Sequence, residues 1–88
     1  MSNTSIKTSY PKNKIKILFL ENISDKAVQF FKEQDYVDVK KITGALSEEE
    51  LIKEIKDVHL LGIRSKTLIT KKVIDSAKKL QAIGCFCI

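Results

Sequence analysis

The chain has 88 residues, of which 43% are hydrophobic and 31% charged, with a net charge of +5 and a pI near 9.3. This length allows one small domain, and the composition is typical of a folded protein rather than a disordered one. No apolar run approaches the roughly 20 residues of a membrane-spanning helix, which argues against a membrane protein of that kind.

The basic residues are unevenly distributed along the chain. Residues 1–16 contain four lysines and no acid, whereas residues 17–88 contain 12 basic and 11 acidic side chains. A nucleic-acid-binding protein usually gathers its charge on one folded face, so we expect no nucleic-acid partner. Residues 1–14 are predicted to be a mobile basic leader. Because they lack the apolar core of a secretory signal, a cytoplasmic location is expected.

The first half of the chain predicts a strand, a helix and a second strand. Residues 15–20 are rich in β-branched and aromatic side chains, and Glu21 ends that run. Ser24 predicts an N-cap for a helix over 25–34, which has an apolar face. Residues 36–40 alternate apolar and polar side chains, as a half-buried edge strand does.

The next two elements repeat this order. Ser47 and Glu50 match a capping box, and they predict a helix that runs to about Lys56. A third strand is predicted over 58–63. No polar alternation follows His59 in this strand, so both of its faces should be covered.

The last two predicted elements are a helix capped by Thr70 and an apolar strand over 82–88. Lysines 78 and 79 suit the negative C-terminal end of that helix. Cys85 and Cys87 share one side of the strand, and two cysteines without a third ligand make a poor zinc site. We interpret them as buried core thiols and predict no metal. In the helix that Thr70 caps, the inward face is predicted to consist of Val73, Ile74, Ala77 and Leu80.

The order β-α-β-α-β-α-β predicts a flavodoxin-like α/β fold with a parallel sheet and helices on both faces. Ligands of such sheets bind beyond the carboxyl ends of the strands. The chain stops within an apolar strand that has no cap or polar finish. We therefore expect residues 15–88 to be the N-terminal part of an incomplete domain.

One stretch has the residue types of an anion site. Arg64 is the only arginine among 16 basic residues, and it follows an apolar strand directly. Arginine binds carboxylates and phosphates with a rigid two-pronged fork. Ser65, Lys66 and Thr67 add donors; Ser65 is interpreted as a donor because the sequence positions no base beside it. His59 lies at the opposite end of the strand, about 20 Å away, and is interpreted as structural.

Three segments carry a family resemblance: IRSKT at 63–67, VIDSAKKL at 73–80 and AIGCFCI at 82–88. With them, residues 14–88 resemble the phosphoglycerate dehydrogenases, which are NAD-dependent D-2-hydroxyacid dehydrogenases. The resemblance implies an oxidoreductase that converts 3-phospho-D-glycerate to 3-phosphohydroxypyruvate with NAD in L-serine biosynthesis. It also implies a homo-oligomer, and it places this chain in the substrate-binding domain.

The resemblance also implies roles for single residues. Arg64 and Ser65 would contact the substrate, and Lys66 stands where an arginine often helps to hold the phosphate. The backbone donors of Phe86 and Cys87 would approach the substrate carboxylate. By position, Ile88 would lie beside the nicotinamide.

No catalytic residue is expected in this chain, because the family's nucleotide-binding and regulatory domains are not part of it. No GxGxxG motif occurs in the sequence, so NAD is expected to bind mainly to another domain. The 88-residue chain is therefore predicted to be inactive alone.

Two alternatives remain open from the sequence. A receiver-like signalling module shares the β-α-β layout, but it needs an acidic pair after strand one and an aspartate at the end of strand three. Here Glu21 is followed by Asn22, and the third strand ends in Arg64. The other alternative is a non-catalytic chain that only pairs with intact subunits.

Overall fold

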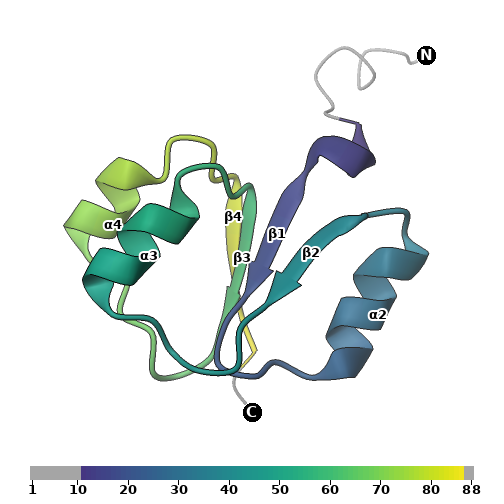
Figure 1. The fold of residues 1–88 in the computed structure, drawn as a ribbon, viewed down its shortest axis with the longest axis horizontal. Helices are drawn as coiled ribbons and strands as arrows, with labels where there is room; N and C mark the ends of the chain where they lie inside the picture. The colour runs from purple at the N-terminus through teal and green to yellow at the C-terminus, as the bar shows by residue number, and fades with distance from the viewer. Residues whose placement is uncertain (1–10, 87–88) are drawn as a thin grey trace.

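The computed structural model describes residues 11–86, which form a single parallel sheet with helices on both faces (Figure 1). The strand order is β2-β1-β3-β4, and the α/β prediction is confirmed. The strands are β1 (Lys16–Phe19), β2 (Asp38–Lys41), β3 (Leu60–Ile63) and β4 (Ala82–Cys85). The helices are η1 (Lys12–Lys14), α2 (Asp25–Glu33), α3 (Glu48–Ile55) and α4 (Lys71–Ser76).

Side-chain alternation along β1 divides the core into two layers. Helix α2 lies on one side of the sheet, and α3 and α4 lie together on the other (Figure 1). Ile17 and Phe19 pack in the α2 layer, whereas Leu18 and Leu20 pack in the layer of α3 and α4. All four side chains are at most 2% exposed, as expected for a central strand covered on both faces.

The predicted caps of the helices are confirmed. The hydroxyl of Ser24 accepts a hydrogen bond from the backbone N–H of Ala27, and that of Thr70 accepts one from Val73. Ser47 and Glu50 form the complete capping box at the start of α3. These contacts satisfy backbone donors that a helix terminus would otherwise leave open.

Helix α4 is shorter than predicted. It ends at Ser76, because Ala77 leaves the helical conformation at ψ 69°. Lysines 78 and 79 therefore lie beyond the helix rather than in its last turn. The prediction of an inward-facing Ile74 is wrong, since this side chain is 56% exposed. Ala77 and Leu80 still pack against the core after the turn.

The interpretation of Cys85 as a buried thiol is also wrong. Within residues 11–86, β4 is an edge strand, paired only with β3, and all four of its residues are exposed. The predicted strand over 82–88 is described only as far as Cys85, because residues 87 and 88 lie outside the described part of the chain. The same holds for residues 1–10 of the predicted leader.

His59 has the structural role that the sequence predicts. It is 5% exposed and lies just before β3, at the amino edge of the sheet. The side-chain Nδ1 of His59 accepts a hydrogen bond from the backbone N–H of Lys16 at 3.0 Å, and the backbone N–H of His59 donates to the Lys16 carbonyl at 2.9 Å. Arg64 lies at the opposite, carboxyl edge.

Candidate anion-binding site

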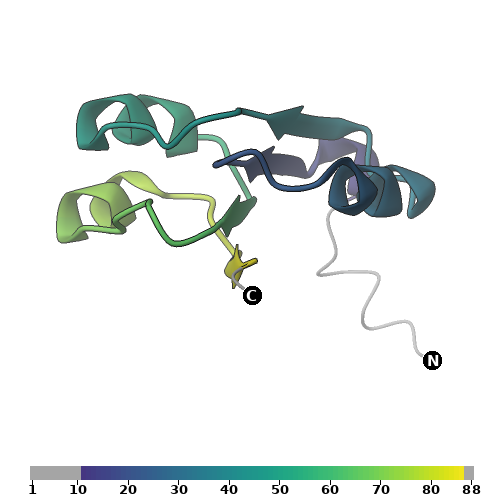
Figure 2. The ribbon, with the colours of Figure 1, turned by 90° about the horizontal axis from the view of Figure 1, so that it is seen from below.

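The carboxyl edge of the sheet is built from the segments that follow β1, β2 and β3 (Figure 2). A hollow of about 290 Å³ lies between these segments. It is lined by Glu21 after β1, by Thr43, Gly44 and Ala45 after β2, and by Arg64, Ser65 and Lys66 after β3. The structure thus brings together the three residues that sequence predicted as an anion site, at the edge where ligands of parallel sheets bind.

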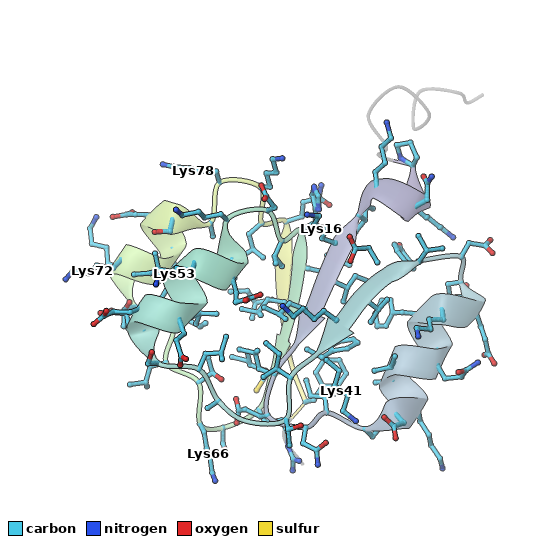
Figure 3. All side chains as sticks on the ribbon, in the orientation of Figure 1. Lys16, Lys41, Lys53, Lys66, Lys72 and Lys78 are labelled. Carbon is cyan, nitrogen blue, oxygen red and sulfur yellow. The ribbon has the colours of Figure 1, made fainter. Side chains whose placement is uncertain are left out.

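The cations at this edge differ in their partners. Lys41, at the end of β2, forms an ion pair with Asp25 at 2.7 Å. Arg64 and Lys66 are exposed, and no ion pair within residues 11–86 involves either of them. Figure 3 shows Lys66 pointing away from the body of the molecule at this edge. Two positive side chains of the hollow can therefore bind an external anion without first breaking an internal pair.

Glu21 organises the loop that carries these cations. Its Oε2 accepts hydrogen bonds from the N–H of Arg64 at 2.9 Å and of Thr67 at 3.0 Å, and from the Thr67 hydroxyl at 2.6 Å. Its Oε1 accepts the N–H of Lys66 at 2.8 Å. Three of the four backbone N–H groups in residues 64–67 thus converge on a carboxylate of the protein itself.

The hydrogen bonds change the acidity of Glu21. Its side chain is only 9% exposed, and burial alone raises the pKa of a carboxyl group. The Thr67 hydroxyl and the N–H groups of Lys66, Arg64 and Thr67 outweigh this effect, and they lower the pKa of Glu21 to about 2. Glu21 is therefore ionised at neutral pH and partly offsets the charge of Arg64 and Lys66.

The backbone at Glu21 turns sharply to place this carboxylate. Glu21 and Asn22 both have left-handed conformations, with φ of 63° and 54°. Their N–H groups donate to the carbonyls of Gly44 and Ile42 at 3.1 and 3.2 Å. Asparagine adopts this conformation more readily than most residues, but it is unfavourable for glutamate, so surrounding contacts must hold Glu21 in it.

Phe86 lies apart from this hollow. Its N–H donates to the carbonyl of Ile63 at 2.8 Å, so this donor is engaged within the sheet. Its ring packs edge-on against Phe19, with 5.6 Å between the ring centroids. A substrate contact through Phe86 stays a prediction, and Cys87 and Ile88 lie outside the described residues.

Residues 11–86 contain neither a cluster of metal-ligating side chains nor a membrane-spanning helix. No three His, Cys, Asp or Glu side chains in this range come together as a metal site would require. Within the same range, no helix is long and apolar enough to cross a bilayer.

The four-stranded parallel sheet with helices on both faces defines this chain as an α/β protein, and the hollow lined by Arg64 and Lys66 lies at the carboxyl edge, where such sheets bind ligands. Residues 17–88 match the family described as D-isomer specific 2-hydroxyacid dehydrogenase, catalytic domain. Because this match covers most of the chain, the chain belongs to that family.

Individual relatives show which members of this family the chain resembles. The chain is 56% identical over 81 residues to D-3-phosphoglycerate dehydrogenase from Dictyostelium discoideum, covering 92% of this chain and 20% of the relative. It is 54% identical over 74 residues to D-3-phosphoglycerate dehydrogenase 1 from Saccharomyces cerevisiae, covering 84% of this chain and 16% of the relative. For the Escherichia coli K12 enzyme of the same name, identity is 44% over 82 residues (93% and 20%). The chain thus spans about a fifth of these relatives' length.

Proposed function

We propose that this chain supplies the substrate-holding part of a phosphoglycerate dehydrogenase. Such an enzyme oxidises 3-phospho-D-glycerate to 3-phosphohydroxypyruvate with NAD, a step of L-serine biosynthesis. The names of the relatives support this proposal. The observation that carries it is the pair of cations, Arg64 and Lys66, that line one hollow with no ion pair among residues 11–86.

The substrate suits these two side chains because it carries a carboxylate and a phosphate on a three-carbon frame. In this proposal the Arg64 guanidinium binds the carboxylate through two parallel hydrogen bonds. Lys66 is a flexible point charge and binds the phosphate, and the Ser65 hydroxyl donates a further hydrogen bond. No group at the hollow is assigned a proton or hydride step.

The described residues do not fit a bound dinucleotide. The three glycines of the chain, at 44, 62 and 84, are too far apart in sequence to form a glycine-rich phosphate loop. The segment that joins β1 to α2, residues 20–24, contains no glycine, so the turn after the first strand is not such a loop either. We therefore expect the 88-residue chain to bind substrate weakly and to reduce no NAD alone.

The proposal is tested by titrating the chain with 3-phosphoglycerate and following its backbone amides by NMR. Arg64→Ala should weaken binding by about 1.5–3 kcal/mol, or about 10- to 150-fold in Kd, because a charge-assisted pair is lost. Arg64→Lys keeps the charge but loses the fork, and it should recover only part of the affinity.

Lys72→Ala is the matched control. It also removes one exposed positive side chain, but from α4, outside the hollow. Its Kd should stay within about twofold of the unsubstituted chain, because surface charges away from a site contribute little. Equal losses for Arg64→Ala and Lys72→Ala would show a general charge effect and contradict the site. NADH formation by the chain alone would refute its predicted inactivity.

A further inference from the structure

We propose that Glu21 is the positioning residue of the anion site, holding Arg64 and Lys66 in the arrangement that binds the ligand. This inference rests on the proposed function for the identity of the ligand. Glu21 itself does not contact the ligand in this proposal. It acts through the loop that follows β3, which it joins to the end of β1 by four hydrogen bonds of 2.6–3.0 Å.

The loop after β3 directs most of its backbone N–H groups to Glu21. Of the four backbone N–H groups in residues 64–67, Glu21 accepts those of Arg64, Lys66 and Thr67. A ligand in the hollow therefore meets the side chains of Arg64 and Lys66 together with Ser65. Without the carboxylate, one buried donor, of Thr67, and two partly buried donors, of Arg64 and Lys66, would lose their acceptor, and the loop would rearrange to satisfy them.

The backbone at the end of β1 is turned so that the Glu21 carboxylate meets the loop after β3. The left-handed conformations of Glu21 and Asn22 turn the chain out of β1 so that the Glu21 side chain reaches a loop 43 to 46 residues away in sequence. Backbone strain of this kind persists only where other contacts stabilise the strained conformation, and it concentrates at functional sites. Here those contacts are the hydrogen bonds from the cation-bearing loop to Glu21.

Charge and position give opposite expectations for this residue. As an anion beside the hollow, Glu21 repels a carboxylate or a phosphate, so its neutralisation should tighten binding if charge alone counted. As the acceptor that fixes the loop, Glu21 favours binding, and its loss should weaken it. The sign of the change on Glu21→Gln therefore separates the two effects, because glutamine is similar in shape but uncharged.

The experiment has two readouts on the 88-residue chain: hydrogen exchange of the amides of residues 64–67, and the Kd for 3-phosphoglycerate. Glu21→Gln should speed exchange of the Arg64, Lys66 and Thr67 amides by at least about tenfold. It should weaken binding by about tenfold although the net charge becomes more positive. Glu33→Gln is the charge-matched control from the far end of α2, and should change neither readout.

Substitutions of Thr67 keep the inference testable if Glu21→Gln fails to fold. Thr67→Val removes the 2.6 Å hydrogen bond from the hydroxyl and should weaken binding about threefold. Thr67→Ser keeps the hydroxyl and should restore most of the affinity. Because Glu21 acts through Arg64, adding Glu21→Gln to Arg64→Ala should cost much less than Glu21→Gln costs alone.

Two outcomes would overturn the positioning role: unchanged amide exchange in Glu21→Gln, or binding that stays equal or becomes tighter. The failure of the proposed function looks different. In that case the unsubstituted chain shows no binding of 3-phosphoglycerate, while the amide exchange of residues 64–67 still decides whether Glu21 holds the loop.

Discussion

Gly62, in β3, has no room for a side chain. A Cβ atom at this position would lie 2.4 Å from Cδ1 of Phe19 and 3.0 Å from Cε1 of Phe86. Both rings press against the backbone of Gly62, and their mutual edge-on packing fixes them there. A strand glycine at a point of close approach is thus explained by the ring of Phe19 in β1 and the ring of Phe86, the residue after β4.

We expect Gly62→Ala to destabilise the chain by about 1–3 kcal/mol, because the rings must leave their packed positions. The gain of about 0.4–1 kcal/mol from a less flexible unfolded chain offsets only part of this cost. Urea unfolding followed by circular dichroism measures the difference as a lower midpoint at an unchanged slope.

Gly44→Ala is the control for this prediction. No atom lies within 4 Å of a Cβ at Gly44, so only the effect on the unfolded chain remains, and Gly44→Ala should raise the free energy of unfolding by about 0.4–1 kcal/mol. If Gly62→Ala and Gly44→Ala changed the free energy of unfolding equally, the effect would come from the flexibility of glycine. The close approach of the rings at Gly62 would then not explain it.

Single residues show where sequence reasoning succeeds and where it stops. The position of Arg64, Ser65 and Lys66 after β3 could be predicted because a strand end is a local feature, whereas their role in binding stays a prediction. Glu21 was missed as the organiser of that loop, because its partners lie 43 to 46 residues away. The available signal was an acid placed directly after the first strand, at the edge where ligands bind.

At the scale of elements, local chemistry predicts where helices begin better than where they end. Ser24, Ser47 and Thr70 each cap a helix as predicted, because the cap contact spans only three residues. The end of α4 depends instead on how Ala77 and Leu80 pack onto the core after the turn. The sequence pattern of residues 73–80 does not contain that information, so its helical length was overestimated.

The capping box predicts a measurable contribution to stability. Ser47→Ala removes the acceptor of the Glu50 N–H and should cost about 1 kcal/mol, measured by thermal or urea unfolding. Ser76→Ala is the matched control at the end of α4. It removes only an exposed bond to the Lys72 carbonyl and should change stability by less than about 0.5 kcal/mol. Equal losses would contradict a specific capping role.

At the scale of the whole molecule, the two faces of the sheet are covered unequally. Helices α3 and α4 cover one face, whereas α2 alone lies on the other (Figure 1). Over β3 and β4, the α2 face contains an apolar hollow of about 190 Å³ that includes Gly62, Gly84 and Phe86. The apolar sequence of β4 correctly indicated a strand. Its burial could not be predicted, because burial depends on what packs against the strand rather than on its own residues.

The folded molecule holds several carboxylates in their ionised form. Lys41 lowers the pKa of Asp25 through a hydrogen bond and its charge, and the Ser47 N–H lowers that of Glu50. Both groups are exposed, so solvent screens these effects. Glu21 differs, because it is buried and accepts four hydrogen bonds. We therefore expect Glu21 to dominate the acid sensitivity of the fold.

The stability of the chain should fall as the pH drops from about 4.5 to about 2, the range between the usual pKa of glutamate and the folded-state pKa of Glu21. Within this range the unfolded chain binds a proton at Glu21 and the folded chain does not, so acid favours unfolding. Above this range Glu21 is ionised in both the folded and the unfolded chain, and its hydrogen bonds contribute their full stabilisation. Urea unfolding at a series of pH values should show this loss in the unsubstituted chain and in Glu33→Gln, and a flatter profile in Glu21→Gln. Parallel profiles for all three would show that another group carries the acid sensitivity.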